Sequence, residues 1–164
     1  KMLKALEKII KKNNFHFEYI DLGGGMGIDY ENKNKKLDLK KYSSLIENFQ
    51  IKNNSKIIFE PGRSIIADCA LLLTKILYIK KTNNINFIIL DAAMNDLIRP
   101  ALYGAEHKII PSIKNNKIVR RKHEFVGPIC ETTDKFLSVN NFQILKEKEI
   151  LSICDVGAYG MVLS

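Results

Sequence analysis

Two segments in the first half of the chain have the composition of anion-binding loops. Gly-Gly-Gly-Met-Gly occupies residues 23–27 and Glu-Pro-Gly-Arg occupies residues 60–63, each directly after a short apolar run. Consecutive glycines let backbone N–H groups approach a phosphate closely, and a helix that begins after Gly62 would direct its first amides at an anion. The glycine spacing fits neither a dinucleotide fingerprint nor a P-loop. A tight structural turn is an equally good interpretation of the first loop.

Glu60 and Cys130 are of residue types that could take part in chemistry as well as in binding. A glutamate at the end of a buried strand is costly unless it meets a cation, so we expect Glu60 to face either a protonated ring nitrogen or Arg63 at the surface. Cys130 lies in Gly-Pro-Ile-Cys-Glu-Thr-Thr-Asp, residues 127–134. The adjacent Glu131 disfavours a thiolate, so this position suits a proton donor better than a nucleophile. An isolated loop cysteine is more often inert.

The positive charge is spread along the chain. Lys and Arg number 26 against 18 Asp and Glu, which gives a formal net charge of +8. The lysines occur in scattered pairs without interleaved aromatic residues, which favours solvated faces over a nucleic-acid surface. Arginine is rare, and two arginines, Arg63 and Arg99, lie in the segments that could do chemistry. Their planar forks suit carboxylate or phosphate.

Other classes of protein are disfavoured by the remaining composition. Cys69, Cys130 and Cys154 are odd in number and widely spaced, which indicates a reducing compartment, and the apolar runs around Cys69 and Cys154 predict buried thiols. The histidines share no metal-ligand spacing, so we expect no metal site. No apolar run approaches the roughly 18 residues that a membrane-spanning helix needs. The opening Lys-Met-Leu-Lys does not have the pattern of a signal peptide, and we expect the chain to be a piece of something longer.

Hydrophobic periodicity predicts two parts that meet at about residue 74. Before it, helical spacing predicts helices over 2–10, 39–49 and 65–73, and apolar runs predict strands over 15–22 and 57–59. Such alternation is the unit of a parallel α/β fold.

After residue 74, short β-rich runs are separated by Asn-rich turn signals. These runs cover residues 76–79, 87–90, 118–121, 142–145 and 150–156. They predict an antiparallel β module with one helical insertion near residues 95–102.

The motifs in combination resemble those of a known family. They are Asp-Leu-Gly-Gly-Gly-Met-Gly-Ile at residues 21–28, Glu-Pro-Gly-Arg at 60–63, Asp-Ala-Ala-Met-Asn-Asp-Leu-Ile-Arg-Pro-Ala-Leu-Tyr at 91–103, Val-Gly-Pro-Ile-Cys-Glu-Thr-Thr-Asp at 126–134 and Asp-Val-Gly-Ala-Tyr-Gly at 155–160. In this order they resemble the pyridoxal-phosphate (PLP) decarboxylases of the alanine-racemase fold, specifically the diaminopimelate decarboxylases. The resemblance implies that residues 1–74 are the last part of a PLP-binding (β/α)₈ barrel and that residues 75–164 belong to a C-terminal antiparallel β domain, both incomplete.

The resemblance also implies a role for individual residues. The residues implied to bind pyridoxal 5'-phosphate are Gly24, Gly25, Glu60, Gly62, Arg63 and Tyr159, with Glu60 on the pyridine nitrogen. Those implied to bind meso-diaminopimelate are Arg63, Arg99, Tyr103, Glu131 and Tyr159. Cys130 would donate the proton that replaces carbon dioxide. In this family Cys130 and Glu131 reach the site of the other subunit, which implies a homodimer with shared active sites.

Departures from the family pattern limit what this chain can do. No segment matches the Schiff-base lysine or the histidine that stacks on the cofactor, so we expect the polypeptide alone to be inactive. Glu131 and Gly104 stand where related ornithine and arginine decarboxylases typically have Asp, which favours diaminopimelate. The expected function is therefore the last step of lysine biosynthesis in the cytoplasm. The alternatives are an ornithine- or arginine-type decarboxylase and a non-catalytic PLP-binding regulatory protein.

Overall fold

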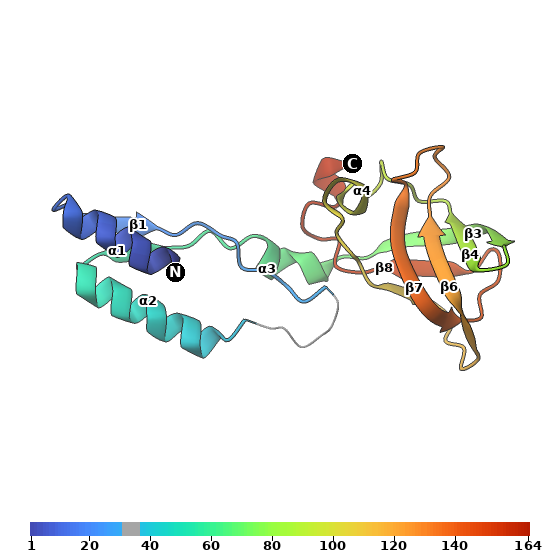
Figure 1. Ribbon diagram of the computed structural model, residues 1–164, viewed down its shortest axis with the longest axis horizontal. Coiled ribbons are helices and arrows are strands. Elements are labelled where there is room, and N and C mark those ends of the chain that lie inside the picture. Colours follow the sequence, from blue (N-terminus) through green and yellow to red (C-terminus); the bar gives the residue numbers. More distant parts are fainter. Residues whose placement is uncertain (31–36) are drawn as a thin grey trace. The chain divides into compact units, whose positions relative to one another are not determined.

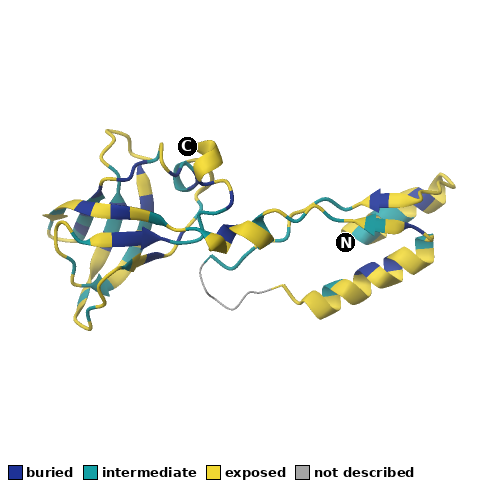
Figure 2. Cartoon of the chain, turned by 180° about the vertical axis from the view of Figure 1, so that it is seen from behind, coloured by how far each residue is buried: buried dark blue, intermediate teal, exposed yellow. Residues whose placement is uncertain are grey.

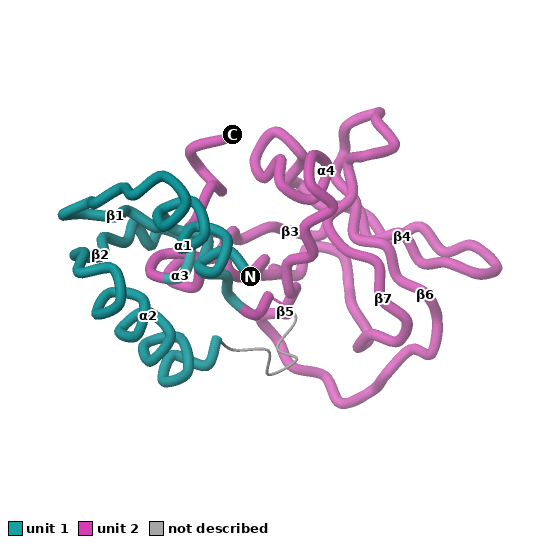
Figure 3. Tube along the Cα trace, turned by 60° about the vertical axis from the view of Figure 1, so that its left-hand side comes forward, with its two compact units in different colours: residues 1–28, 34–64 teal, residues 29–33, 65–164 magenta. Residues whose placement is uncertain are grey.

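The computed structural model describes residues 1–30 and 37–164 and divides the chain into two compact units (Figure 3). Unit 1 consists of residues 1–28 and 34–64, and unit 2 of residues 29–33 and 65–164. The residues directly after Ser64 therefore group with unit 2 by their contacts, whereas the predicted domain boundary at residue 74 stays a prediction. Within the described residues, no helix is long and apolar enough to cross a membrane.

Unit 1 contains a β-α-β element. Its helices and strands are α1 (Met2–Lys12), β1 (Tyr19–Asp21), α2 (Leu39–Asn53) and β2 (Lys56–Ile58). The strands pair in parallel, with Ile20 opposite Ile57, and α2 makes the crossover that a parallel pair requires. The Asp38 side chain caps α2 by accepting the Lys41 N–H at 3.0 Å. The predicted strand 15–22 is shorter than expected because β2 offers it a partner over three residues only.

A small apolar cluster holds unit 1 together. Ile10 of α1, Ile20 of β1 and Phe49 of α2 are buried, so each of these elements contributes one core residue. Leu3, Leu6, Leu22 and Ile57 pack around them and are partly buried. The predicted helices over 2–10 and 39–49 are confirmed, because their apolar stripes supply this cluster.

The predicted helix over 65–73 is wrong. The structure has a four-residue helix, α3 (Arg63–Ile66), then a 3₁₀ turn, η1 (Ala67–Cys69), and strand β3 begins at Leu72. Leu72 and Leu73 pair with Ile153 and Ser152, so pairing with a distant strand overrides the local helical pattern.

Cys69 is exposed and Cys154 is half-buried, which corrects the prediction of two buried thiols.

Unit 2 is built on a curved mixed sheet (Figure 1). Its strands are β3 (Leu72–Lys81), β4 (Ile85–Leu90), β5 (Ile109–Pro111), β6 (Ile118–Val126), β7 (Lys135–Gln143) and β8 (Ile150–Ile153). Their order within the described residues is β5-β8-β3-β4-β6-β7. The first half of β3 pairs with β8, and its second half pairs with β4. This strand therefore joins the two halves of the sheet.

The sheet differs from the predicted antiparallel module in one pairing. β4 and β6 run parallel, whereas the other neighbouring strands of this sheet are antiparallel. The connection between them, residues 91–117, contains α4 (Arg99–Tyr103) and the unpredicted strand β5, and is long enough for a crossover. The helical insertion predicted near 95–102 is present as α4.

The core of unit 2 is formed by buried residues of this sheet, and buried positions alternate with less buried ones along β4 and the second half of β6 (Figure 2). Its fully buried members include Ile76, Leu90, Phe125, Leu151 and Ile153, from the four strands β3, β4, β6 and β8. Leu97, in the turn before α4, is buried against the same cluster. The core therefore fixes the turn that leads into α4.

Two buried histidines make unit 2 sensitive to acid. His107 is 0% exposed and His123 is 3% exposed, and burial lowers the pKa of both below the ordinary value of 6.5. Each pairs its Nδ1 with a backbone carbonyl, of Cys154 at 2.9 Å and of Arg121 at 2.8 Å.

We therefore predict that the free energy of unfolding decreases as the pH falls below about 6.5, because the unfolded chain then binds protons that the folded chain does not. Urea denaturation between pH 7 and pH 5 measures this slope. His107→Gln and His123→Gln should each flatten it, whereas His16→Gln, at an exposed position, should not. A slope unaffected by both buried-site variants would contradict the prediction.

Candidate functional site

The two glycine-bearing loops of unit 1 lie side by side. β1 and β2 are parallel, so their carboxyl ends meet at the same edge, and the Glu60 N–H donates to the Gly23 carbonyl at 2.9 Å. A Cβ at Gly24 would lie 2.5 Å from the Glu60 carbonyl oxygen, and Gly25 has φ +81°. Only glycine fits these two positions without strain. The sequence prediction that both loops lie at adjacent strand ends is confirmed, and the Glu60 side chain is exposed there.

Arg99 begins α4 in unit 2 and is almost completely buried. It is 5% exposed, and its Cζ lies 5.7 Å from the ring centroids of Tyr103 and Tyr159 and 5.9 Å from that of Tyr30. Three aromatic faces therefore surround the guanidinium group. Among the described residues, Nε has no hydrogen-bond partner and no carboxylate lies within ion-pair distance. A buried cation of this kind is costly unless an anion binds it.

Tyr30 and His107 extend this cluster and were not predicted from the sequence. Their rings meet edge to face with centroids 5.1 Å apart. The Tyr30 hydroxyl and His107 Nε2 are also buried without a hydrogen-bond partner in the described part of the chain. Buried polar atoms without partners are uncommon, and their grouping around one cation is typical of a ligand site. Tyr30 lies three residues after Gly27 in sequence, and no local sequence pattern marks it or His107 as part of this cluster.

Hydrogen bonds hold the turn before α4 in place. Asp91 Oδ1, at the end of β4, accepts the Thr74 hydroxyl and the Lys75 N–H, both at 2.7 Å. Partial burial raises the pKa of the Asp91 carboxyl, but these hydrogen bonds outweigh it and the net pKa is lowered. The carboxylate therefore stays ionised and fastens the exit of β4 to β3.

The loop 127–134 carries Cys130 and Glu131, and both side chains are exposed. Glu131 Oε1 accepts the Thr133 N–H at 3.3 Å, the Thr132 hydroxyl at 3.1 Å and the Thr133 hydroxyl at 3.3 Å. The hydrogen bond from the Thr133 N–H is the largest cause of the lowered pKa of Glu131. Glu131 is therefore a fixed, ionised carboxylate, which suits an ammonium group.

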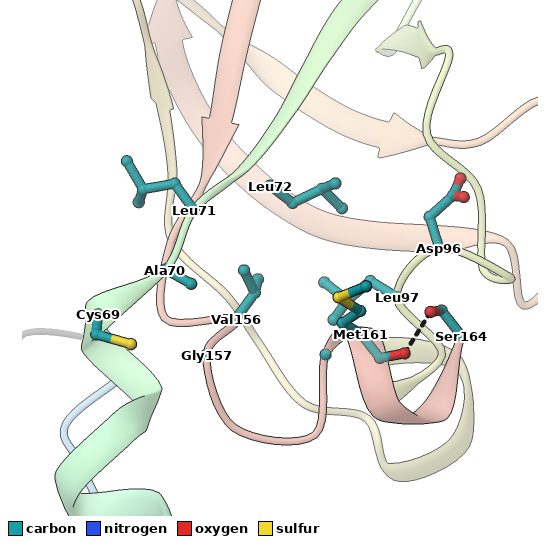
Figure 4. Close-up of a pocket in the computed structure, with 11 residues that line it drawn as sticks. Cys69, Ala70, Leu71, Leu72, Asp96, Leu97, Val156, Gly157, Met161 and Ser164 are labelled. Carbon is teal, nitrogen blue, oxygen red and sulfur yellow. Dashed lines mark hydrogen bonds between the residues drawn. The ribbon is translucent and has the colours of Figure 1, made fainter.

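Tyr159 lies in the turn between β8 and η2 (Met161–Leu163), where its φ is +60°. The same turn borders a largely apolar cavity of about 500 Å³ (Figure 4). Leu72, Leu97 and Val156 line it together with the polar residues Asp96 and Ser164. None of the residues predicted to act in the site lines this cavity, so we assign it no part in the chemistry.

The predicted site residues thus form two groups. Gly24, Gly25, Glu60, Gly62 and Arg63 belong to unit 1, and Arg99, Tyr103, Cys130, Glu131 and Tyr159 belong to unit 2. The structure brings Gly24 to Glu60 in the first group, and Arg99 to Tyr103 and Tyr159 in the second. Among the residues that the structure describes, no three His, Cys, Asp or Glu side chains could hold a metal ion together.

The sheet and these motifs define a class of enzyme domain. Residues 17–157 match the C-terminal sheet domain of the pyridoxal-dependent decarboxylases. The chain belongs to this family, which the sequence analysis predicted.

Within the family, the chain is similar to diaminopimelate decarboxylases. It is 38% identical to that of Vibrio cholerae over 162 residues, which cover 99% of this chain and 38% of the relative. The crystal structure of diaminopimelate decarboxylase from Helicobacter pylori complexed with L-lysine superposes with a TM-score of 0.82 at 37% identity, covering 98% of this chain and 39% of that one. That from M. jannaschii, also with L-lysine, gives 0.86 at 32% identity, covering 99% and 38%. The chain therefore spans about two fifths of the length of its relatives.

We predict that Arg99→Met stabilises the folded chain by about 1 kcal/mol or more, because it removes a buried charge without a carboxylate partner and keeps a side chain of similar length. Urea denaturation at pH 7 measures the change. Arg121→Met is the matched control: Arg121 is exposed and donates to the Thr82 carbonyl at 3.0 Å, so the change should stay within about 0.5 kcal/mol. A loss of stability in Arg99→Met would show that the arginine is structural.

Proposed function

We propose that this chain is the C-terminal part of a PLP-dependent diaminopimelate decarboxylase, which forms L-lysine and carbon dioxide from meso-diaminopimelate. The observation that carries the proposal is Arg99. Its guanidinium group is buried among three aromatic rings, and this environment suits an anionic ligand. The decarboxylases of the family act on amino acids, and diaminopimelate has a second carboxylate at the end that does not react. Arg99 suits that carboxylate.

The residues of unit 1 fit the cofactor. Gly24 lets the first loop approach the Glu60 backbone closely, and Gly25 has open space where its Cβ would be; with the backbone of Gly62 and Arg63 they would hold the phosphate. The exposed Glu60 carboxylate would pair with the pyridine nitrogen, and Tyr159 would add a hydroxyl donor. When bound, PLP supplies the electron sink that makes loss of carbon dioxide feasible.

We propose that residues of unit 2 bind the substrate and donate the proton. Arg99, Tyr103 and Tyr159 would bind the distal carboxylate together with Arg63 of unit 1, and the ionised Glu131 would bind the distal ammonium. The thiol of Cys130 would donate its proton to the carbon that lost carbon dioxide. The Schiff-base lysine lies outside this chain, so we propose that the chain works only within a longer cytoplasmic enzyme, as a homodimer whose subunits share their active sites.

A chimaera tests the proposal: this chain replaces the matching part of the Vibrio cholerae relative, with which it aligns over 162 residues. The chimaera should release carbon dioxide from diaminopimelate in the presence of PLP, and this chain alone should not. A folded chimaera that binds PLP without decarboxylating diaminopimelate would instead support a non-catalytic PLP-binding protein. Preference for ornithine or arginine would support the related decarboxylases.

In the chimaera, Arg99→Ala should raise KM for diaminopimelate about tenfold or more with a smaller effect on kcat, because the distal carboxylate binds in both the ground state and the transition state. Steady-state kinetics measure both constants. Arg121→Ala, at an exposed position, should leave them unchanged. An unchanged KM in Arg99→Ala would contradict the role of Arg99.

Cys130→Ser should lower kcat about 100-fold and leave KM nearly unchanged, because a hydroxyl is a much weaker acid than a thiol. Lysine formation measured in heavy water should then show a larger solvent isotope effect, since proton transfer becomes slower. Cys69→Ser, also at an exposed cysteine, is the control. Equal rates in Cys130→Ser and Cys69→Ser would argue against Cys130 as the proton donor.

A further inference from the structure

Asp134 is a buried carboxylate that joins two segments of the proposed site. It lies directly before β7 and is 3% exposed. Its Oδ1 accepts the Met94 N–H at 2.7 Å, and its Oδ2 accepts the Ile129 N–H at 2.8 Å. Met94 belongs to the turn that leads into α4, whereas Ile129 directly precedes Cys130 in the other segment. One side chain therefore bridges the two segments.

The backbone of Asp134 closes the loop on itself. Its N–H donates to the Glu131 carbonyl at 3.1 Å, and its carbonyl accepts the Gly127 N–H at 3.0 Å. A Cβ at Gly127 would lie 2.2 Å from Oδ2, so any side chain there would displace the carboxylate. The glycine at the start of the loop and the aspartate at its end therefore depend on each other.

Both oxygens of Asp134 are required as acceptors. Among the described residues, no Lys or Arg forms an ion pair with it, so the two backbone N–H groups are what compensates its buried charge. An asparagine would offer one acceptor oxygen and turn its NH₂ group towards the other N–H donor. The site needs a carboxylate of this length.

We infer that Asp134 is the positioning residue that sets the loop of Cys130 and Glu131 against the segment carrying Arg99 and Tyr103. The inference rests on the proposed function for the roles of those four residues. α4 also packs against β7, the strand that Asp134 precedes, so the bridge lies where these elements already meet. The predicted proton donor, which would reach the other subunit's site in the proposed homodimer, and the predicted carboxylate-binding arginine are thereby held by one buried group.

Nuclear magnetic resonance of the 164-residue chain tests the bridge. The amide protons of Met94 and Ile129 should both lie downfield, because one carboxylate accepts both. In Asp134→Asn both should move upfield, and hydrogen exchange of the Ile129 amide should become about tenfold faster or more. The matched control is Asp96→Asn, because Asp96 accepts the Ala93 N–H at 2.8 Å within the turn of Met94 and, among the described residues, forms no hydrogen bond with the loop 127–134. It should leave Ile129 unchanged.

If Asp134→Asn does not fold, Gly127→Ala tests the same bridge. The added methyl group would displace the Asp134 carboxylate without removing it. Met94 and Ile129 amide protons without a downfield shift in the unmodified chain, or an unchanged Ile129 amide in both variants, would overturn the inference. In the chimaera, Asp134→Asn should lower kcat at least tenfold, and Asp96→Asn should have little effect. A normal kcat in Asp134→Asn would reject the positioning role while leaving the proposed function intact. An inactive parent chimaera would reject the function without altering the amide result.

Discussion

The double pairing of β3 is the constraint on which unit 2 depends. Its first half is hydrogen-bonded to β8 and its second half to β4, so one strand orders the two halves of the sheet. The exit of β8 leads to the turn of Tyr159, and the exit of β4 leads through Asp91 to α4 and Arg99. Arg99 and Tyr159 come from segments far apart in sequence. Their side chains meet because β3 fixes the spacing between β4 and β8.

Unit 2 contains two buried charges that differ in how the protein compensates them. Asp134 accepts hydrogen bonds from two backbone N–H groups, and its environment therefore resembles that of a structural group. Arg99 has aromatic faces around it and no carboxylate partner among the described residues. The protein thus keeps a cation in a place that burial alone would disfavour, which is the expected arrangement for a binding group.

The sequence predicted best what depends on short-range patterns. The glycine loops, the helices over 2–10 and 39–49 and most strands of the sheet follow from local spacing and turn residues. The helix over 65–73 failed because Leu72 and Leu73 pair with β8, about 80 residues away, and no local pattern reveals this. The parallel β4–β6 pair was missed because it depends on the path of the long connection over residues 91–117, which local sequence patterns do not reveal. Tyr30 and His107 were missed because their contact with each other is purely tertiary.

The edge of the sheet formed by β7 has a consequence for aggregation. β7 is an edge strand, so its outer N–H and C=O groups form a template on which another chain could add a strand. Irregular register with β6, positive φ at Asn141 and a lysine at its first position all make this edge unsuitable for regular pairing. Within the described residues, local geometry and charge therefore protect the β7 edge of this sheet. Mutations that straighten β7 would promote aggregation without touching any residue of the site.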